Sequence, residues 1–286
     1  MITFDDYQAK APQPTIFLTE EDFEDHGDTR VHWLGSAGVF INTHGTTLMI
    51  DPVLGYMDSQ PPISEAYEIL LVKPPIRPEE VPHLDAVLYT HTDWDHFTNH
   101  TAVTLQPKTD TYHGTPFLNQ ILRYYGIHER QRRAHQIGES FQIGAARITL
   151  TLADHVYQYL LPERYDWTFK KEDCCGYLVE TVDGTIWVPG DTRLLPEHLE
   201  MQQVDLLFMD YSDHKTHFGR EGSLQLSNAL RQAQIVMYHY GTYYRPDVTY
   251  FSADPEEVIP YIEGKDRFHL VAPGEAIVLH GSHRLT

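Results

Sequence analysis

The sequence predicts an α/β fold in which β-sheets are covered by helices on their outer faces. Short β-prone runs dominate the first third of the chain, and strand-like and helix-like segments alternate after it. The 286 residues are enough to bury a large core within one domain of this class. No Gly/Ser-rich or Pro-rich linker and no repeat of solenoid length interrupts the chain, so we expect residues 1–286 to form a single domain.

The first strands are predicted from β-branched and apolar runs that end at turn residues. These runs cover residues 30–34, 39–42 and 46–50, and the small residues 35–38 predict a turn between the first two. A further run, residues 86–89, ends at Thr90, after which the chain becomes polar at once. A strand that stops there delivers the following side chains to the edge of a sheet.

Later segments alternate between the two kinds of element. Residues 115–125 predict a helix, and residues 147–152, 176–182 and 185–188 predict strands, the last two joined as a hairpin through Asp183 and Gly184. A helix from about residue 222 to 231 is expected between strands at 204–209 and 234–238.

The residues best suited to chemistry follow the strand at 86–89. His91, Asp93, Asp95 and His96 are all of metal-ligand type and lie within six positions, where a tight loop can aim them at one point. A single histidine or aspartate is more often a solvated or capping residue. Four of them at this spacing favour a metal site.

The pattern His-x-Asp-x-Asp-His resembles the His-x-His-x-Asp-His signature of the metallo-β-lactamase superfamily. The order of the other motifs is similar to the branch that contains L-ascorbate-6-phosphate lactonase. This resemblance implies an αββα sandwich of the metallo-β-lactamase type. The further motifs are Trp33-Leu34-Gly35, Ala37-Gly38, Asp51-Pro52, Ala153-Asp154-His155, Gly190-Asp191-Thr192 and residues 238–242.

The resemblance also implies a ligand set for two divalent metal ions. His91, Asp93 and His155 correspond to ligands of the first ion. Asp95, His96 and His239 correspond to ligands of the second, and Asp191 corresponds to a bridge between them. Asp95 and Asp191 are also the candidate catalytic residues. Taken alone, His155 or His239 is more often an ordinary core or surface histidine, and the signature reverses that interpretation.

Asp93 stands where the family more commonly has histidine. Its carboxylate is a harder ligand than imidazole, so manganese competes with zinc as the native metal, and iron is a further candidate. Together, Asp93, Asp95 and Asp191 contribute three negative charges, and two divalent ions contribute four positive charges. A bridging hydroxide then makes the cluster formally neutral. Two ions that share a water lower its pKa and polarise the bond under attack, which predicts hydrolysis of a small lactone, phosphodiester or amide.

Substrate contacts are predicted in the loop before the second helix and just after His239. His214, His217 and Arg220 lie in that loop. Its backbone amides and the guanidinium of Arg220 can bind an anionic group of the substrate. A solvated polar loop explains them equally well. Tyr243 is the candidate beyond His239, against the alternative of an ordinary core or surface aromatic.

Composition narrows the partners and the compartment. The net charge of −20 disfavours nucleic acid and anionic membranes, so we expect a small-molecule substrate as the partner. The only two cysteines, Cys174 and Cys175, are adjacent and fit a reducing environment. No signal peptide or membrane span is evident, which predicts a cytoplasmic protein. The sequence leaves a homo-oligomer open.

Two other classes of function compete with hydrolysis. One is a non-hydrolytic, metal-dependent oxidoreductase on the same fold, and the other is a metal-stabilised binding protein without turnover. A binding protein normally has damaged ligand positions, whereas all seven candidates here can bind a metal.

Overall fold

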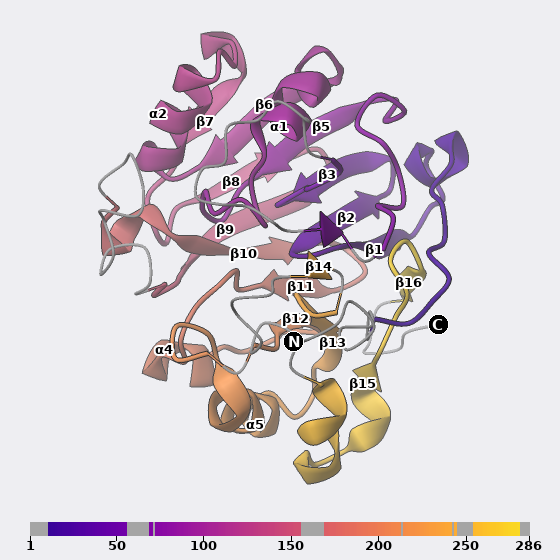
Figure 1. The fold of residues 1–286 in the computed structure, drawn as a ribbon, viewed down its shortest axis with the longest axis vertical. Helices are drawn as coiled ribbons and strands as arrows, with labels where there is room; N and C mark the ends of the chain where they lie inside the picture. The colour runs from indigo at the N-terminus through magenta and orange to yellow at the C-terminus, as the bar shows by residue number, and fades with distance from the viewer. Residues whose placement is uncertain are drawn as a thin grey trace, which may run out of the picture.

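Two mixed β-sheets, each of seven strands, form the centre of the structure (Figure 1). The structure is a computed structural model that describes residues 11–55, 69–70, 72–155, 169–212, 214–241, 243–244 and 254–280. Helices α1 and α2 lie on one side of the sheets, and α4 and α5 lie on the other. This arrangement is the predicted αββα sandwich.

The first sheet combines antiparallel and parallel pairs in the order β16-β1-β2-β3-β5-β6-β7. β1, β2, β3 and β16 pair antiparallel, whereas β3, β5, β6 and β7 pair parallel. The strands are β1 (Thr29–Gly35), β2 (Gly38–Thr43), β3 (Thr46–Ile50), β5 (Leu84–Leu88), β6 (Thr109–Gly114), β7 (Arg132–Ala134) and β16 (Ala276–Leu279).

The second sheet has the order β15-β13-β12-β11-β10-β9-β8. Strands β8 to β11 are antiparallel neighbours, and β11, β12, β13 and β15 are parallel. The strands are β8 (Ser140–Ile143), β9 (Ala146–Leu152), β10 (Cys175–Glu180), β11 (Thr185–Val188), β12 (Leu206–Asp210), β13 (Gln234–Tyr238) and β15 (Phe268–His269).

The helices and the minor elements are short. Thr98 and Thr115 cap the N-termini of α1 and α2 through their hydroxyl groups, and Pro116 occupies the first turn of α2. The helices are α1 (Asn99–Leu105), α2 (Pro116–Tyr124), α4 (Pro196–Leu199) and α5 (Gly219–Ala229). A two-stranded sheet joins β4 (Ile69–Leu70) to β14 (Tyr243–Tyr244). Single 3₁₀ turns occur at Glu20–Phe23, Gln106–Lys108, Glu129–Gln131, Lys171–Asp173, Pro255–Glu257, Ile259–Tyr261 and Lys265–Arg267.

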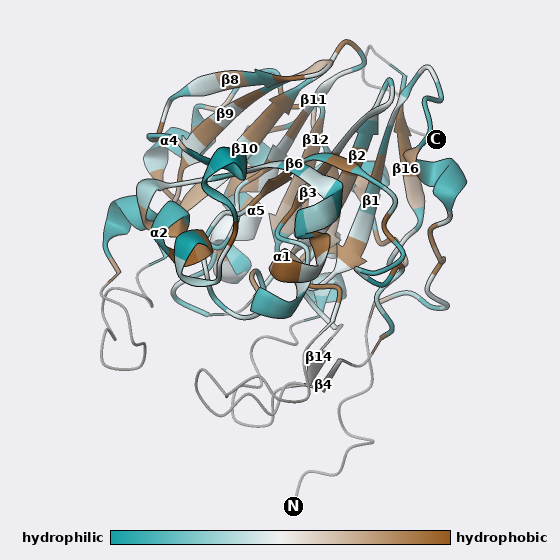
Figure 2. Cartoon of the chain, turned by 90° about the horizontal axis from the view of Figure 1, so that it is seen from above, coloured by the Kyte–Doolittle hydropathy of each residue, from teal (hydrophilic) through white to brown (hydrophobic). Residues whose placement is uncertain are grey.

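Alternation along the strands divides the buried side chains between two cores. In β3, Leu48 and Ile50 belong to the core that both sheets share, while Met49 belongs to the core beneath α1 and α2. β5 follows the same rule, because Val87 lies on the helix side. Both faces of the central strands are therefore apolar, and in Figure 2 the hydrophobic colour follows these strands.

The predicted strands are confirmed to within two residues, and residues 46–50, 185–188 and 234–238 match β3, β11 and β13 at both ends. The predicted helix at 222–231 was placed too late, because α5 begins at Gly219. Gly222 lies inside α5, where a side chain would come within 3.3 Å of Leu194 Cβ, so this glycine marks close packing. The sequence reasoning missed helices α1 and α4 and strands β4, β6, β7, β8, β14, β15 and β16. Among the described residues, none of the helices has the length and apolar composition that crossing a bilayer requires.

The direction of the strands brings their C-terminal ends to a common edge of the sandwich. β3 and β5 are parallel in the first sheet. In the second sheet β9 and β11 both run antiparallel to β10, and β11, β12 and β13 are parallel. The segments that follow these strands contain all the predicted metal ligands, which explains why positions far apart in the chain can meet.

Candidate metal centre

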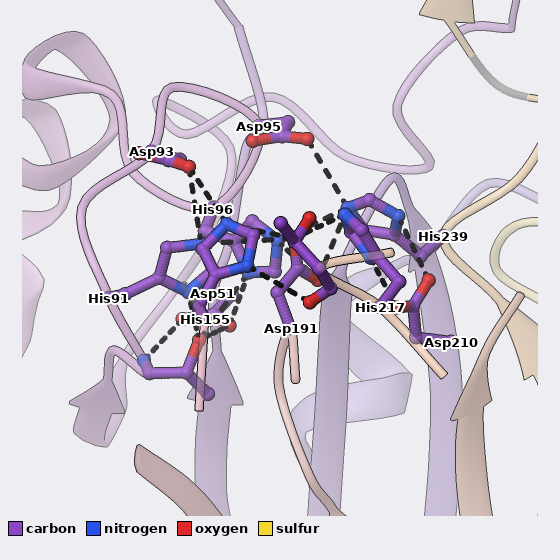
Figure 3. A network of polar contacts seen from close by, with 12 residues as sticks. Asp51, His91, Asp93, Asp95, His96, His155, Asp191, Asp210, His217 and His239 are labelled. Atoms are coloured by element: carbon purple, nitrogen blue, oxygen red, sulfur yellow. Dashed lines mark hydrogen bonds and ion pairs between the residues drawn. The ribbon is translucent and has the colours of Figure 1, made fainter. Parts of the chain in front are cut away.

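Aspartates and histidines from both sheets converge at this edge (Figure 3). His91 follows β5, His155 follows β9, and Asp191 follows β11. His239 comes directly after β13, and Asp93, Asp95 and His96 lie in the loop after His91. All seven predicted ligand residues are thus brought to one place.

Asp191 lies at the centre of the cluster, and its Oδ2 atom faces three imidazoles. The distances from Oδ2 are 3.9 Å to His91 Nε2, 3.8 Å to His155 Nε2 and 3.6 Å to His217 Nε2. Asp93 lies on the far side of this group, with its Oδ2 3.2 Å from His155 Nε2 and 3.8 Å from His91 Nε2. The donor atoms of His91, His155 and Asp191 all lie within 4.8 Å of one another.

The other oxygen of Asp191 faces a second group. Oδ1 is 3.1 Å from His96 Nε2 and 3.5 Å from His239 Nε2. Asp95 Oδ2 is 3.2 Å from His239 Nε2, so this group has a carboxylate of its own. The donor atoms of Asp95, His96, Asp191 and His239 also lie within 4.8 Å of one another. One carboxylate therefore separates two clusters of donors.

Burial and mutual charge set the electrostatics of the centre. Burial lowers the pKa of His91 well below its usual value. Burial acts the same way on His96, but the neighbouring Asp191 and Asp51 carboxylates hold its pKa well above that value. For Asp191 burial favours the neutral acid, yet His239 and His96 hold its pKa well below the ordinary range. Buried carboxylates of this kind need positive charge beside them.

Asp51 orients His96 from behind. Its Oδ2 atom lies 2.8 Å from His96 Nδ1, while Thr90 donates its backbone N–H to Oδ1 at 2.7 Å and its hydroxyl to Oδ2 at 2.5 Å. Asp51 has a left-handed backbone, with φ of 46°. Its carboxylate holds His96 with Nε2 toward Asp191. The sequence analysis noted Asp51 as the end of a strand and as part of the Asp51-Pro52 motif, and its contact with His96 appears only when β3 pairs with β5.

The turn at residues 35–38 supports two members of the second donor group, Asp95 and His239. Ser36 accepts a hydrogen bond at its carbonyl from the backbone N–H of His239 at 3.0 Å, and its hydroxyl donates to the carbonyl of Asp95 at 2.9 Å. His239 itself has φ of 61°. A non-glycine residue in this region costs on the order of 1 kcal/mol, which surrounding contacts must offset.

Asp210 is a buried residue that the sequence reasoning missed. It ends β12, and its Oδ2 lies 2.5 Å from His217 Nδ1 while its Oδ1 lies 3.3 Å from His239 Nδ1. His217, predicted as a substrate contact, is therefore part of the buried cluster. The signal for Asp210 was its position at the end of a strand paired in register with Tyr238, one residue before His239.

The other predicted substrate contacts have different surroundings. His214 is half-buried, its Nδ1 lies 2.6 Å from Thr216 Oγ1, and burial with the adjacent His217 lowers its pKa to about 4. Arg220 is exposed, donates to the carbonyl of Glu257 at 3.1 Å and lies 5.5 Å from the centre of the Tyr261 ring. Tyr243 belongs to β14, and its side chain is outside the described part of the structure.

The donors fit metal ions in their chemistry and spacing. His91 Nε2 and Asp93 Oδ1 are buried and have no hydrogen-bond partner among the described residues. Such atoms are costly to bury unless something compensates them. Imidazole and carboxylate atoms 3 to 4 Å apart suit an ion that binds each donor at about 2.1 Å. Asp93 lies outside the group in which His91, His155 and Asp191 are mutually close.

Known proteins resemble this chain in sequence and in fold. A metal-dependent hydrolase of Pyrobaculum arsenaticum is 24% identical over 262 residues, covering 87% of this chain and all of that protein. An isothiocyanate hydrolase from Delia radicum gut bacteria superposes with a TM-score of 0.69 at 19% identity, over 88% of this chain and 100% of the other. CmlA, a diiron β-hydroxylase of Streptomyces venezuelae, gives a TM-score of 0.63 at 15% identity, over 94% of this chain and 55% of its own.

The family match covers the entire candidate centre from His91 to His239. The model of the beta-lactamase superfamily domain matches residues 46–240, which is more than half of the chain. The two sheets and their covering helices have the architecture of that superfamily. The chain therefore belongs to the beta-lactamase superfamily domain family and has the metallo-β-lactamase fold.

Proposed function

We propose that this protein is a hydrolase that uses two divalent metal ions and acts on a small molecule. The observation that carries the proposal is the position of Asp191, whose two carboxylate oxygens face two separate groups of donors. A carboxylate in this position can bridge two ions. The name of the Pyrobaculum relative, a metal-dependent hydrolase, supports the same conclusion.

The proposed ligands divide as the sequence predicted. His91, His155 and Asp93 would hold one ion, and Asp95, His96 and His239 would hold the other, with Asp191 between them. When bound, the ions would activate a water molecule and polarise the bond under attack. Asp51 keeps Nε2 of His96 available by facing its Nδ1. The donor residues themselves are buried.

We propose zinc or manganese as the metal, with iron as the third candidate. Asp93, Asp95 and Asp191 make this a carboxylate-rich set, and carboxylates favour harder ions. A lactone, phosphodiester or amide is the proposed substrate class, and the lactonase-like branch stays a prediction. His217 is the best-supported substrate contact because its Nε2 faces Asp191. His214 and Tyr243 are weaker candidates, and Arg220 is engaged with Glu257 and Tyr261.

A non-hydrolytic oxidoreductase is the second candidate. The likeness to CmlA, which is a diiron enzyme, favours it, because the shared fold shows that this architecture also accommodates redox chemistry. A binding protein without turnover is less well supported, since every proposed ligand position can bind a metal.

Metal analysis followed by activity screening separates these functions. Protein purified without added metal is analysed for zinc, manganese and iron, and its visible spectrum is recorded. It is then assayed with each ion against lactones, phosphodiesters and amides, with Asp191→Ala as the inactive control. We expect about two ions per chain and hydrolysis of one class. Tightly bound iron with a redox-active absorption band and no hydrolysis would favour the second candidate.

A further inference from the structure

Asp154 lies directly before the proposed ligand His155 and is fully buried. Two half-exposed cations from other segments of the chain compensate its carboxylate. Arg193 donates from Nε to Asp154 Oδ2 at 2.8 Å, and its Nη2 lies 2.6 Å from the same oxygen. Lys171 Nζ lies 3.3 Å from this oxygen. A carboxylate buried in this way depends on such partners, because an uncompensated buried charge is strongly unfavourable.

The backbone of Asp154 is bound to the same segment as its side chain. Its N–H donates to Thr192 Oγ1 at 2.8 Å, and the N–H of Arg193 donates to the carbonyl of Asp154 at 3.1 Å. Thr192 and Arg193 directly follow Asp191 in the chain. One residue therefore ties the loop that carries His155 to the loop that carries Asp191.

The contact with Lys171 brings in a third segment. A 3₁₀ turn connects Lys171 to the start of β10. There the backbone N–H of Cys175 donates to the carbonyl of Thr90 at 3.0 Å, and Thr90 directly precedes His91. Lys171 therefore joins Asp154 to the segment that supports His91.

The three segments joined by Asp154 support His91, His155 and Asp191, which we call the first donor group. The donor atoms of these three residues lie within 4.8 Å of one another (Figure 3). We propose that Asp154 is a positioning residue for the first donor group, which it serves by fixing the three segments relative to one another through its two cationic partners. Metal binding by this group rests on the proposed function, whereas the joining of the segments rests on the contacts of Asp154 alone.

The second donor group is held in place by other contacts. Asp51 faces His96 from behind, and the turn at residues 35–38 is bonded to the backbone of His239 and of Asp95. The two ions of the proposed centre therefore have separate supports, although one bridging carboxylate lies between them. The affinity for one ion can then be lowered without an equal loss at the other.

A carboxylate buried against cations contributes more to a fixed arrangement than to net stability. Desolvation of the charges offsets much of their attraction, so replacing such a pair by apolar groups is often neutral for stability. Separating the partners leaves a buried charge uncompensated, which restricts the joined loops to one relative position. Asp154→Asn removes this restriction, preserves the shape of the side chain and leaves the backbone donors and acceptors in place.

Binding of Zn²⁺ can be followed at each donor group separately. Free Zn²⁺ is set with a chelator buffer, and the imidazole nitrogen-15 signals of His155 and His239 report occupation of the first and the second group. His155→Gln and His239→Gln assign these signals. In Asp154→Asn the His155 binding curve should move to about 10- to 100-fold higher free Zn²⁺. The His239 curve should stay within about twofold of that of the unmodified protein.

Arg193→Gln provides a second variant, because it changes a half-exposed residue and leaves the fold intact even if Asp154→Asn does not fold. It should shift the His155 curve in the same direction and leave the His239 curve in place. The double variant should bind Zn²⁺ no more weakly than Asp154→Asn alone, because the two side chains act as one unit. An unchanged His155 curve in Arg193→Gln, or equal shifts of both curves in either variant, would overturn the proposal.

Asp183→Asn is the matched control for loss of a buried acceptor. Asp183 lies at the other end of β11 from Asp191, and its Oδ2 accepts from Thr29 Oγ1 at 2.8 Å and lies 2.8 Å from His44 Nε2. Both binding curves should be unchanged in this variant. A shift of the His155 curve as large as that in Asp154→Asn would show that general loosening of the fold, and not the position of Asp154, determines the affinity.

Hydrogen exchange of the metal-free protein tests the joining of the loops without any metal. The backbone amides of Asp154 and Arg193 should lose protection in Asp154→Asn, whereas the amide of His239, which is bonded to Ser36, should keep it. Unchanged protection of the Arg193 amide would contradict the proposal. If the unmodified protein binds no Zn²⁺, the proposed function fails, and hydrogen exchange still decides whether Asp154 holds the loops together.

Discussion

Gly176 provides a test of how closely the sheet controls the candidate centre. It lies in β10, and a Cβ atom added there would come 2.6 Å from the carbonyl oxygen of Pro189 and 2.6 Å from Thr151 Oγ1. Ordinary contact begins at 3.4 Å, so the Pro189 backbone must move by about 0.8 Å to accept Gly176→Ala. Pro189 is two residues from Asp191, which places the displacement next to the proposed bridge.

Two effects of Gly176→Ala follow from this contact. Crowding in a packed strand costs about 1–3 kcal/mol, so the free energy of unfolding should fall by that amount. The Thr151 hydroxyl cannot simply rotate away without loss, because it accepts a hydrogen bond from the Trp187 indole at 3.1 Å. A movement of Asp191 by a fraction of an ångström should also weaken metal binding by about tenfold, since donor geometry determines affinity.

Urea unfolding in the presence of a chelator measures the first effect, and competition binding of Zn²⁺ measures the second. Gly55→Ala is the control, because an added Cβ there would make only an ordinary 3.5 Å contact with His100. We expect the control to change stability by less than about 0.5 kcal/mol. If Gly176→Ala is equally mild and binds Zn²⁺ as tightly as the unmodified protein, the close approach of Pro189 does not constrain the centre.

Two further predictions concern the metal ions themselves. Asp191→Ala should abolish binding of both ions and any hydrolysis, because the two carboxylate oxygens of Asp191 face the two donor groups. If metal analysis of the variant still finds two bound ions, Asp191 does not bridge them. Removing metal with a chelator should lower the melting temperature of the protein, because free ion at 100 times Kd stabilises the folded state by about 2.7 kcal/mol per site. Calorimetry with and without the chelator measures this change. Equal melting temperatures would contradict the prediction.

Local sequence signals were sufficient for the central strands of both sheets but not for β6, β7, β8, β15 and β16, and not for every helix. β3 and β11 consist of β-branched and apolar residues that end at turn residues or at Asp51, and both were predicted at their observed bounds. α1 was missed because its seven residues include Thr101, Val103 and Thr104, which have weak helix propensity. Its start depends on the Thr98 cap and on packing of Ala102 and Leu105 against the sheet.

The candidate site was predictable where one motif lists several donors and unpredictable where tertiary pairing creates the contact. The spacing from His91 to His96 indicates a metal site without any structure. Asp210 lies directly after a predicted strand and before the polar loop, and its significance appears only when β12 pairs with β13 in register. The position of His217 was recognised, but its burial beside Asp191 follows from how the loop before α5 folds back onto the cluster.

The remaining prediction concerns Asp93, where the chain has a carboxylate at a position more commonly occupied by histidine. Its Oδ2 lies between His155 and His91, at 3.2 and 3.8 Å from their Nε2 atoms. Asp93→His would replace a hard, negatively charged donor by a softer neutral one and should shift metal preference from manganese toward zinc. Total affinity should also fall, because Asp93 Oδ1 has no hydrogen-bond partner among the described residues that could orient a new imidazole from behind.

Competition between Mn²⁺ and Zn²⁺ on the unmodified protein and on Asp93→His decides this prediction. We expect the Zn²⁺-to-Mn²⁺ affinity ratio to rise by about tenfold or more, since one ligand of the first group changes from oxygen to nitrogen. Asp93→Ala is the control for ligation itself. If Asp93→Ala binds both ions as the unmodified protein does, Asp93 is not a ligand. If it binds more weakly while the ratio in Asp93→His stays constant, Asp93 binds the metal but does not select it, and the other donors of that group determine the preference.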